Sequence, residues 1–136
     1  MAKLAILGDI NDGQIETLRS AGIRTTGALM KSCAGRKGRR EIAKRTGIKE
    51  GTLLRWAGQV DLYRIKGVGM DYAILLEAAG YPTSGVLARQ DAEDVYRRLA
   101  EQNRVAPLVK KLPTRYQVLD WIRNASRLSE MVPFEH

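Results

Sequence analysis

The sequence of 136 residues predicts an all-α protein, and three observations support this fold class. Apolar residues recur at helical spacing along nearly the whole chain, and no segment alternates apolar and polar residues as a half-buried strand would. Glycines and short polar side chains that can cap helices stand at the ends of the periodic segments. An internal repeat, LRSAGIRTTGALMK against LLEAAGYPTSGVLAR, supports the same interpretation.

Four helices are expected in the first half of the chain. The first ends at Gly22, and Thr25 is placed to cap a short second helix. The third covers residues 36–46 and ends at Gly47, because glycine readily takes the left-handed conformation that closes a helix. The fourth covers residues 50–59.

The next stretch, LYRIKGVGMDYAILL, predicts two short helices joined by a glycine hairpin. Gly67 and Gly69 are expected to let the backbone turn where a Cβ would clash. Val68 between them is expected to insert into the core, and residues 70–79 form the second helix. This stretch resembles the helix-hairpin-helix element of DNA repair and recombination proteins.

Three more helices complete the chain. Thr83 and Asp91 are plausible caps for the first two of them. Pro107 and Pro113 interrupt the segment that leads to a last amphipathic helix around Trp121. The aromatic residues expected to pack in the core rather than stack on bases are Trp56, Tyr72, Tyr116 and Trp121.

The repeat predicts two helical units, residues 1–61 and 62–128, followed by a tail at residues 129–136. No flexible linker separates the units, and neither is large enough to bury a sufficient core alone. We therefore expect two pseudo-symmetric halves that share one core within a single domain. The matched positions include Leu18 with Leu76, Gly22 with Gly80 and Thr25 with Thr83.

The same offset places the hairpin of the first copy at Asp9, Ile10 and Asn11, where both glycines are missing. An aspartate there puts negative charge where a phosphate would sit. We expect this first hairpin to be structural only.

The net charge of +8 is concentrated in one segment. Residues 31–49 contain eight basic residues and one acidic residue, Glu41, whereas the rest of the chain has fifteen basic and fourteen acidic residues. Such a segment attracts polyanions in a salt-dependent way. On a helix, Arg36, Arg40 and Lys44 would share one face. The candidate phosphate contacts in this segment are Arg36, Lys37, Arg39, Arg40, Lys44 and Arg45.

The glycine hairpin is the second candidate phosphate site. Free backbone N–H groups of Gly67 and Gly69, at the positive end of the following helix, favour a phosphate oxygen. Lys66 would supply positive charge, with Arg64 nearby, whereas Asp71 opposes it. The candidate hairpin contacts are Arg64, Lys66, Gly67, Val68 and Gly69.

Taken together, the chain resembles an uncharacterised bacterial family, a domain of unknown function within the helix-hairpin-helix superfamily. The resemblance covers residues 8–128 and rests on the runs GIRTTGALM, GRREIAKRTGIKEGTLLRW and DLYRIKGVGMDYAILLEAAG and on the closing helix at Trp121. It implies a helical fold with nucleic-acid contact and no assigned reaction.

Catalysis finds little support in the sequence. The single histidine, His136, is the last residue, and the single cysteine, Cys33, therefore has no histidine in a folded segment to act as its base. The carboxylates are scattered, and no phosphate-binding loop of the nucleotide-hydrolase type is present. We expect no enzymatic activity, no metal, no cofactor and no small-molecule ligand.

The composition also bears on location. The apolar run at residues 4–7 is too short for a signal peptide, and no segment approaches the length of a membrane span. A lone cysteine fits a reducing compartment. We expect a cytoplasmic protein with no membrane partner.

The expected function is sequence-independent binding of nucleic acid, DNA rather than RNA, on one surface formed jointly by the basic helix and the hairpin. Two alternatives remain open. One is a protein-interaction or scaffold module with an acidic partner, whose hairpin has lost contact with DNA. The other is a helix-turn-helix DNA binder using residues 39–56, with Lys49, Thr52 and Arg55 facing the groove.

Overall fold

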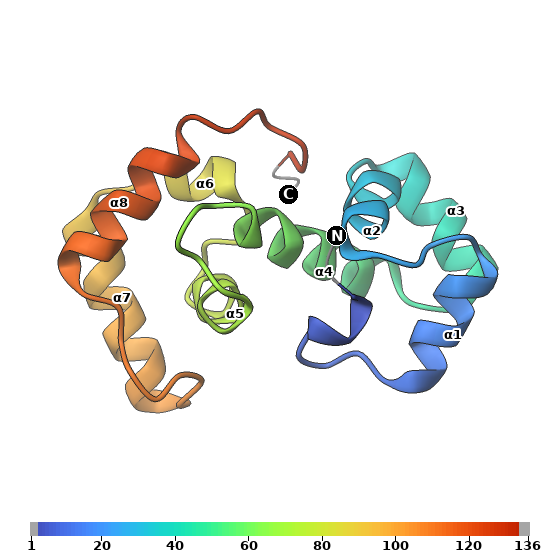
Figure 1. The fold of residues 1–136 in the computed structure, drawn as a ribbon, viewed down its shortest axis with the longest axis horizontal. Helices are drawn as coiled ribbons and strands as arrows, with labels where there is room; N and C mark the ends of the chain where they lie inside the picture. The colour runs from blue at the N-terminus through green and yellow to red at the C-terminus, as the bar shows by residue number, and fades with distance from the viewer. Residues whose placement is uncertain (1–2, 134–136) are drawn as a thin grey trace.

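The computed structural model describes residues 3–133 and confirms the all-α fold class. Within these residues no strand forms, and the only β-type pairing is an isolated bridge between Lys3 and Thr25. No helix among them is long and apolar enough to cross a bilayer. The elements, labelled in Figure 1, are a 3-10 turn η1 (Leu4–Ile6) and helices α1 (Asp12–Ser20), α2 (Thr26–Cys33), α3 (Arg36–Thr46), α4 (Glu50–Tyr63), α5 (Met70–Ala78), α6 (Ser84–Ala88), α7 (Ala92–Val105) and α8 (Arg115–Ala125).

Capping chemistry explains why most helix boundaries could be predicted. The side chains of Thr25, Thr83 and Asp91 each accept a hydrogen bond from a backbone N–H in the first turn of the helix that follows. The helix predicted at residues 36–46 has those bounds, and Gly47 closes it with a φ of 79°. The helix predicted at 50–59 continues to Tyr63.

The ends of α1 and α5 have the same local structure. Gly22 and Gly80 both have positive φ, 88° and 104°. In each case the next residue donates a hydrogen bond back to a leucine carbonyl, from Ile23 N to Leu18 O at 2.8 Å and from Tyr81 N to Leu76 O at 2.9 Å. These are the positions that the repeat pairs, so the local pattern agrees with the repeat, whereas duplication of the whole unit stays a prediction.

The buried apolar residues form two clusters instead of the one shared core expected. The first contains residues from Leu4 to Val60 together with Val132, and the second contains residues from Leu62 to Ala125. Met70 packs against both clusters, and α4 lies between them, packed against α2 and α5 (Figure 1).

The described part of the segment expected as a tail, residues 129–133, is anchored. Val132, 1% exposed, packs into the N-terminal cluster, and the carbonyl of Ser129 accepts a hydrogen bond from Arg64 at 2.9 Å. This segment therefore returns from α8 to the N-terminal half (Figure 1). His136 lies outside the described residues.

Two glycines allow a helix to approach other backbone closely. A Cβ on Gly58 of α4 would lie 2.3 Å from the carbonyl oxygen of Pro82, and one on Gly38 of α3 would lie 2.1 Å from that of Ser32. Because both neighbours are backbone atoms, neither contact could be relieved by turning a side chain.

Both tryptophans are buried, as expected, with 0% exposure for Trp56 and 2% for Trp121. Tyr72 packs against Trp121 with ring centroids 5.1 Å apart. The expectation for Tyr116 was wrong: its side chain is 71% exposed, because this residue begins the outward face of α8.

The loop that precedes α1 is held by polar contacts. Asp9 accepts hydrogen bonds from the Arg55 guanidinium at 2.5 Å and from the Trp56 indole at 2.7 Å. Asn11 caps α1 reciprocally with Gln14. Partial burial raises the pKa of Asp9, but the hydrogen bonds from Arg55 and Trp56 outweigh it, so that this pKa lies below its ordinary value.

Candidate nucleic-acid interface

The glycine hairpin connects α4 to α5 and has the tight turn that the sequence predicted. Gly67 has a φ of 91°, which a side-chain-bearing residue rarely adopts. A Cβ there would also lie 3.3 Å from Nε1 of Trp121, so this turn sits directly against α8. Val68 is 4% exposed and inserts into the second cluster, as expected.

The amides of the hairpin differ in whether they are already bonded. Val68 N donates to Ile65 O at 3.0 Å, and the buried side chain of Val68 is equally unable to reach a ligand, so Val68 is removed from the candidate contacts. The amides of Gly67 and Gly69 have no hydrogen-bond acceptor within residues 3–133. Gly69 is the N-cap of α5 and no side chain caps this helix, so the first-turn amides are open as well.

Gly69 differs from what the sequence suggested. Its φ is −77°, and a Cβ at this position would meet no other atom within 4 Å. The expected clash is therefore present at Gly67 and absent at Gly69. The fold does not require a glycine at position 69, and its missing side chain leaves the amides of α5 accessible.

A groove of about 740 Å³ runs beside the hairpin, and two lysines that the sequence analysis missed line it. Its walls are Gly67, Gly69 and the first turn of α5 on one side, and the α7–α8 loop with Lys110 and Lys111 on the other. Both lysines are exposed, as is Lys66 in the hairpin, and none of the three has an ion pair among the described residues.

The loop that carries these lysines is fixed by hydrogen bonds. Asn103 of α7 accepts from the amides of Leu108 and Val109, at 2.7 and 3.0 Å, and donates to the carbonyl of Val109. The Tyr72 hydroxyl of α5 donates to the Lys111 carbonyl at 3.0 Å. The sequence signal for this site was the Lys-Lys pair between the two prolines, in a segment interpreted only as a connection.

Arg64 is not available to contact a phosphate, because its guanidinium already has partners within the protein. Its guanidinium donates to the carboxylate of Asp61, at 3.0 and 2.5 Å, and to the carbonyl of Ser129. Asp61 is 1% exposed and also accepts from the amide and hydroxyl of Ser84, so Arg64 compensates a buried charge. We correct its assignment from phosphate contact to structural ion pair.

The basic helix α3 presents most of its cations to solvent. Lys37, Arg40, Lys44 and Arg45 are exposed and have no ion pair among residues 3–133, and Arg36 is also exposed.

Arg39 is the exception on this helix, because its side chain is 3% exposed. Its guanidinium donates to the carbonyls of Cys33 and Ala34 at 3.1 and 2.9 Å. Arg39 therefore holds the end of α2 and is removed from the candidate contacts.

The basic helix and the hairpin do not form the joint surface that was expected. Figure 1 shows α3 at one end of the molecule, with the loop between α4 and α5 beyond the middle. α3 precedes α4 and the hairpin follows it, so this 14-residue helix, about 21 Å long by ideal geometry, separates them. They are two separate cationic surfaces.

The helix-turn-helix alternative uses only the first turns of α4, up to Trp56. Eight residues of α4 are buried, but six of them follow residue 56, and within the first turns only Leu53 and Trp56 are buried. Arg55, one of the three residues expected to face a groove, is held by Asp9. This ion pair counts against Arg55 as a base contact, whereas Lys49 is exposed.

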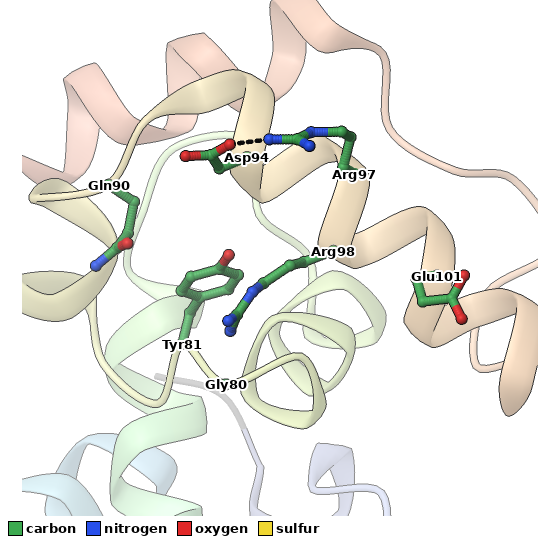
Figure 2. Close-up of a pocket in the computed structure, with 7 residues that line it drawn as sticks. All are labelled: Gly80, Tyr81, Gln90, Asp94, Arg97, Arg98 and Glu101. Carbon is green, nitrogen blue, oxygen red and sulfur yellow. Dashed lines mark hydrogen bonds and ion pairs between the residues drawn. The ribbon is translucent and has the colours of Figure 1, made fainter.

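A further pocket of about 620 Å³ lies between α7 and the loops on either side of α6, which contribute Gly80, Tyr81 and Gln90 (Figure 2). Arg97 pairs with Asp94, and the Arg98 guanidinium lies 6.0 Å from the centroid of the Tyr81 ring. Burial raises the pKa of the Tyr81 hydroxyl, against the opposing charge of Arg98. Since two carboxylates, of Asp94 and Glu101, accompany the two arginines, this pocket has no charge excess to attract an anion.

Metal-ligating side chains do not form a cluster within residues 3–133. No group of three or more His, Cys, Asp or Glu side chains in this part of the chain is arranged to hold a metal ion. Cys33 is 0% exposed, and burial raises the pKa of its thiol to about 11, against the opposing charge of Arg39. This thiol is therefore a packing group at neutral pH.

Comparison with known proteins identifies a family. The family model described as Domain of unknown function (DUF4332) matches residues 9–128, which include every helix described above. No curated protein and no solved structure matches the chain. Because this family model covers nearly the whole sequence, the chain belongs to the DUF4332 family.

Proposed function

We propose that this protein binds the sugar-phosphate backbone of double-stranded DNA without sequence preference, using the groove beside the glycine hairpin (the hairpin groove). The observation that carries this proposal is the convergence of unbonded amides and unpaired lysines. Gly67 and Gly69 present N–H groups, and Lys110 and Lys111 line the same groove. Amides at a helix N-terminus and ammonium groups are complementary to a phosphate oxygen.

Gly69 adds support because nothing in the packing requires it. A side chain at this position would stand over the first-turn amides of α5, and the space it would fill is open. A glycine that the fold does not need, at the mouth of a cationic groove, fits a surface that a ligand must approach closely.

α3 provides a second, separate contact in this proposal. Its exposed arginines and lysines attract a polyanion through the field they share, without fixing a geometry. Asp71 in the first turn of α5 opposes anion binding in the hairpin groove. We therefore expect weak, strongly salt-dependent affinity.

The test is a fluorescence anisotropy titration of a labelled duplex of mixed sequence against salt concentration. If Lys66, Lys110 and Lys111 each neutralise one phosphate, log K falls with log salt at a slope of about −2.7, and more steeply if α3 also engages. A flat salt response, or no binding at low salt, contradicts the proposal.

Charge reversal distinguishes a specific role of the hairpin groove from a general effect of net charge. The double variant Lys110→Glu with Lys111→Glu is expected to lose most of the affinity. The matched control is Arg19→Glu with Arg24→Glu, which changes net charge equally at exposed positions around the end of α1. Equal losses in both double variants would show that net charge alone attracts the duplex, and would remove the hairpin groove from the proposal.

A protein-interaction module is the second candidate, favoured by exposed apolar side chains around the α7–α8 loop. Val105, Leu108 and Tyr116 are 69%, 43% and 71% exposed. A protein that purifies free of nucleic acid, fails to bind the duplex and co-purifies with an acidic protein would favour this candidate.

A further inference from the structure

A second pocket adjoins the hairpin groove and has the opposite charge. It encloses about 390 Å³ between the loop at Gly8 and Asp9, helix α4 and helix α5. Figure 1 shows α5 and the N-terminal segment on the same side of α4. Asp71, Ile74 and Glu77 lie on one face of α5, three residues apart, and all three line this pocket (the acidic pocket).

The carboxylates of the acidic pocket are only partly compensated. Arg55 pairs with Asp9, so these two charges cancel. Asp71 and Glu77 have no ion pair among the described residues, and Glu77 accepts one hydrogen bond, from Gln59 Nε2 at 3.2 Å. A negative pocket on a protein of net charge +8 is an exception to its general electrostatics.

Gln59 supplies an independent indication of a missing partner. Its side chain lines the acidic pocket and is 1% exposed, and its Oε1 is the one buried side-chain polar atom in residues 3–133 without a hydrogen-bond partner. Turning the amide over would place Oε1 against the Glu77 carboxylate, so the orientation is fixed by Glu77 and the oxygen is left as an acceptor. A buried acceptor without a donor is costly.

We propose that the acidic pocket binds the cationic head of a small organic amine or guanidine. Two carboxylates and the Gln59 carbonyl are all acceptors, and an ammonium or guanidinium group offers several donors with the charge they favour. Ile74 and Leu108 provide apolar surface for the alkyl stem of such a molecule. The pocket volume lies in the lower part of the range of small-ligand sites.

Trp56 provides the readout, because its indole N–H donates to Asp9 in the wall of the acidic pocket. The full chain is titrated with agmatine and with n-butylamine, and the indole N–H resonance of Trp56 is followed by NMR. n-Butanol is the uncharged control of matched shape. We expect saturable shifts with both cations and none with the alcohol.

Two conservative variants assign the site. Asp71→Asn and Glu77→Gln each remove one charge and keep the shape, and each is expected to weaken amine binding about threefold. Glu101→Gln, which removes a charge from the pocket on α7 that shares no residue with the acidic pocket, is the matched control and leaves the affinity unchanged. Asp71 is exposed, so its variant keeps the fold and the test stays decisive.

Three outcomes would overturn the proposal: no saturable shift with either cation, an equal response to the alcohol, or equal weakening by all three variants. The measurement involves no nucleic acid, so failure here leaves the function proposed above untouched, and failure of duplex binding does not bear on the amine site.

Discussion

Replacing Gly69 with aspartate should raise stability while it weakens DNA binding. Gly69 is the N-cap of α5, with backbone angles suited to a capping side chain and no atom in the way of a Cβ. An aspartate there can accept hydrogen bonds from the open first-turn amides. It then occupies the groups proposed to hold the phosphate and adds a negative charge beside them.

The two effects can be estimated separately. Replacing glycine by aspartate at an N-cap contributes a few tenths of a kcal/mol, and its charge near a helix N-terminus roughly as much again. For a chain of this size the sum raises Tm by about 2 °C. Loss of a charge-assisted contact of about 1.5 kcal/mol or more weakens duplex binding at least tenfold.

Thermal unfolding followed by circular dichroism measures the first effect, and duplex anisotropy at fixed salt measures the second. Gly51→Asp is the matched control, since Gly51 lies in the first turn of α4 with no atom within 4 Å of a Cβ. It adds the same charge at the far end of α4 and should keep most of the affinity. A Gly69→Asp protein that binds as tightly as Gly51→Asp refutes the role of the hairpin amides.

Three further predictions concern stability and reactivity. Gly58→Ala should lower the free energy of unfolding by about 1–3 kcal/mol, because its Cβ would meet Pro82 O at 2.3 Å. Gly51→Ala on the same helix should raise the free energy of unfolding by about 0.4–1 kcal/mol, because its Cβ would meet no atom within 4 Å. Urea unfolding of both variants measures these changes. The Cys33 thiol, buried and with a pKa of about 11, should resist a thiol reagent in the native protein and react after unfolding. Asp9 has a lowered pKa, so its contribution to stability is complete above the ordinary carboxyl pKa of about 4 and is lost as the pH falls through the pKa of the folded state. The difference in stability between the wild type and Asp9→Asn should therefore shrink on acidification. Urea unfolding at several pH values measures this difference.

Local chemistry explains which parts of the fold the sequence revealed. The helix at residues 36–46 was predicted with its observed bounds because a glycine at position 47 closes it within its own last turn. Thr25, Thr83 and Asp91 cap the helices that follow them for the same reason. In each case the interaction spans only a few residues, so the pattern along the chain contains it.

The candidate site is formed by contacts between residues that are far apart in the sequence, and such contacts could not be predicted from local patterns. Lys110 and Lys111 lie beside the hairpin only because Tyr72 and Asn103 fix their loop there. The basic segment was interpreted as uniformly exposed, yet Arg39 is buried because it reaches carbonyls at the end of α2. Counting charges along a sequence cannot distinguish a cation that faces solvent from one that satisfies buried backbone.

Glycine illustrates the same limit at a single position. Gly67 and Gly69 look equivalent in the sequence, and both were expected to avoid a clash. Only Gly67 has the positive φ and the close neighbour that require glycine. The difference arises from the packing of Trp121 against the turn, which is a contact between distant parts of the chain.

Backbone amide NMR gives the most direct test of the central claim, that the hairpin amides and the loop lysines hold a phosphate together. Isotope-labelled protein is titrated with a short DNA duplex at low salt, and every amide resonance is followed. The account predicts that the amides of Gly67, Gly69 and the first turn of α5 shift most, together with those of Lys110 and Lys111. Shifts confined to α3, or spread evenly over all exposed basic residues, would contradict it.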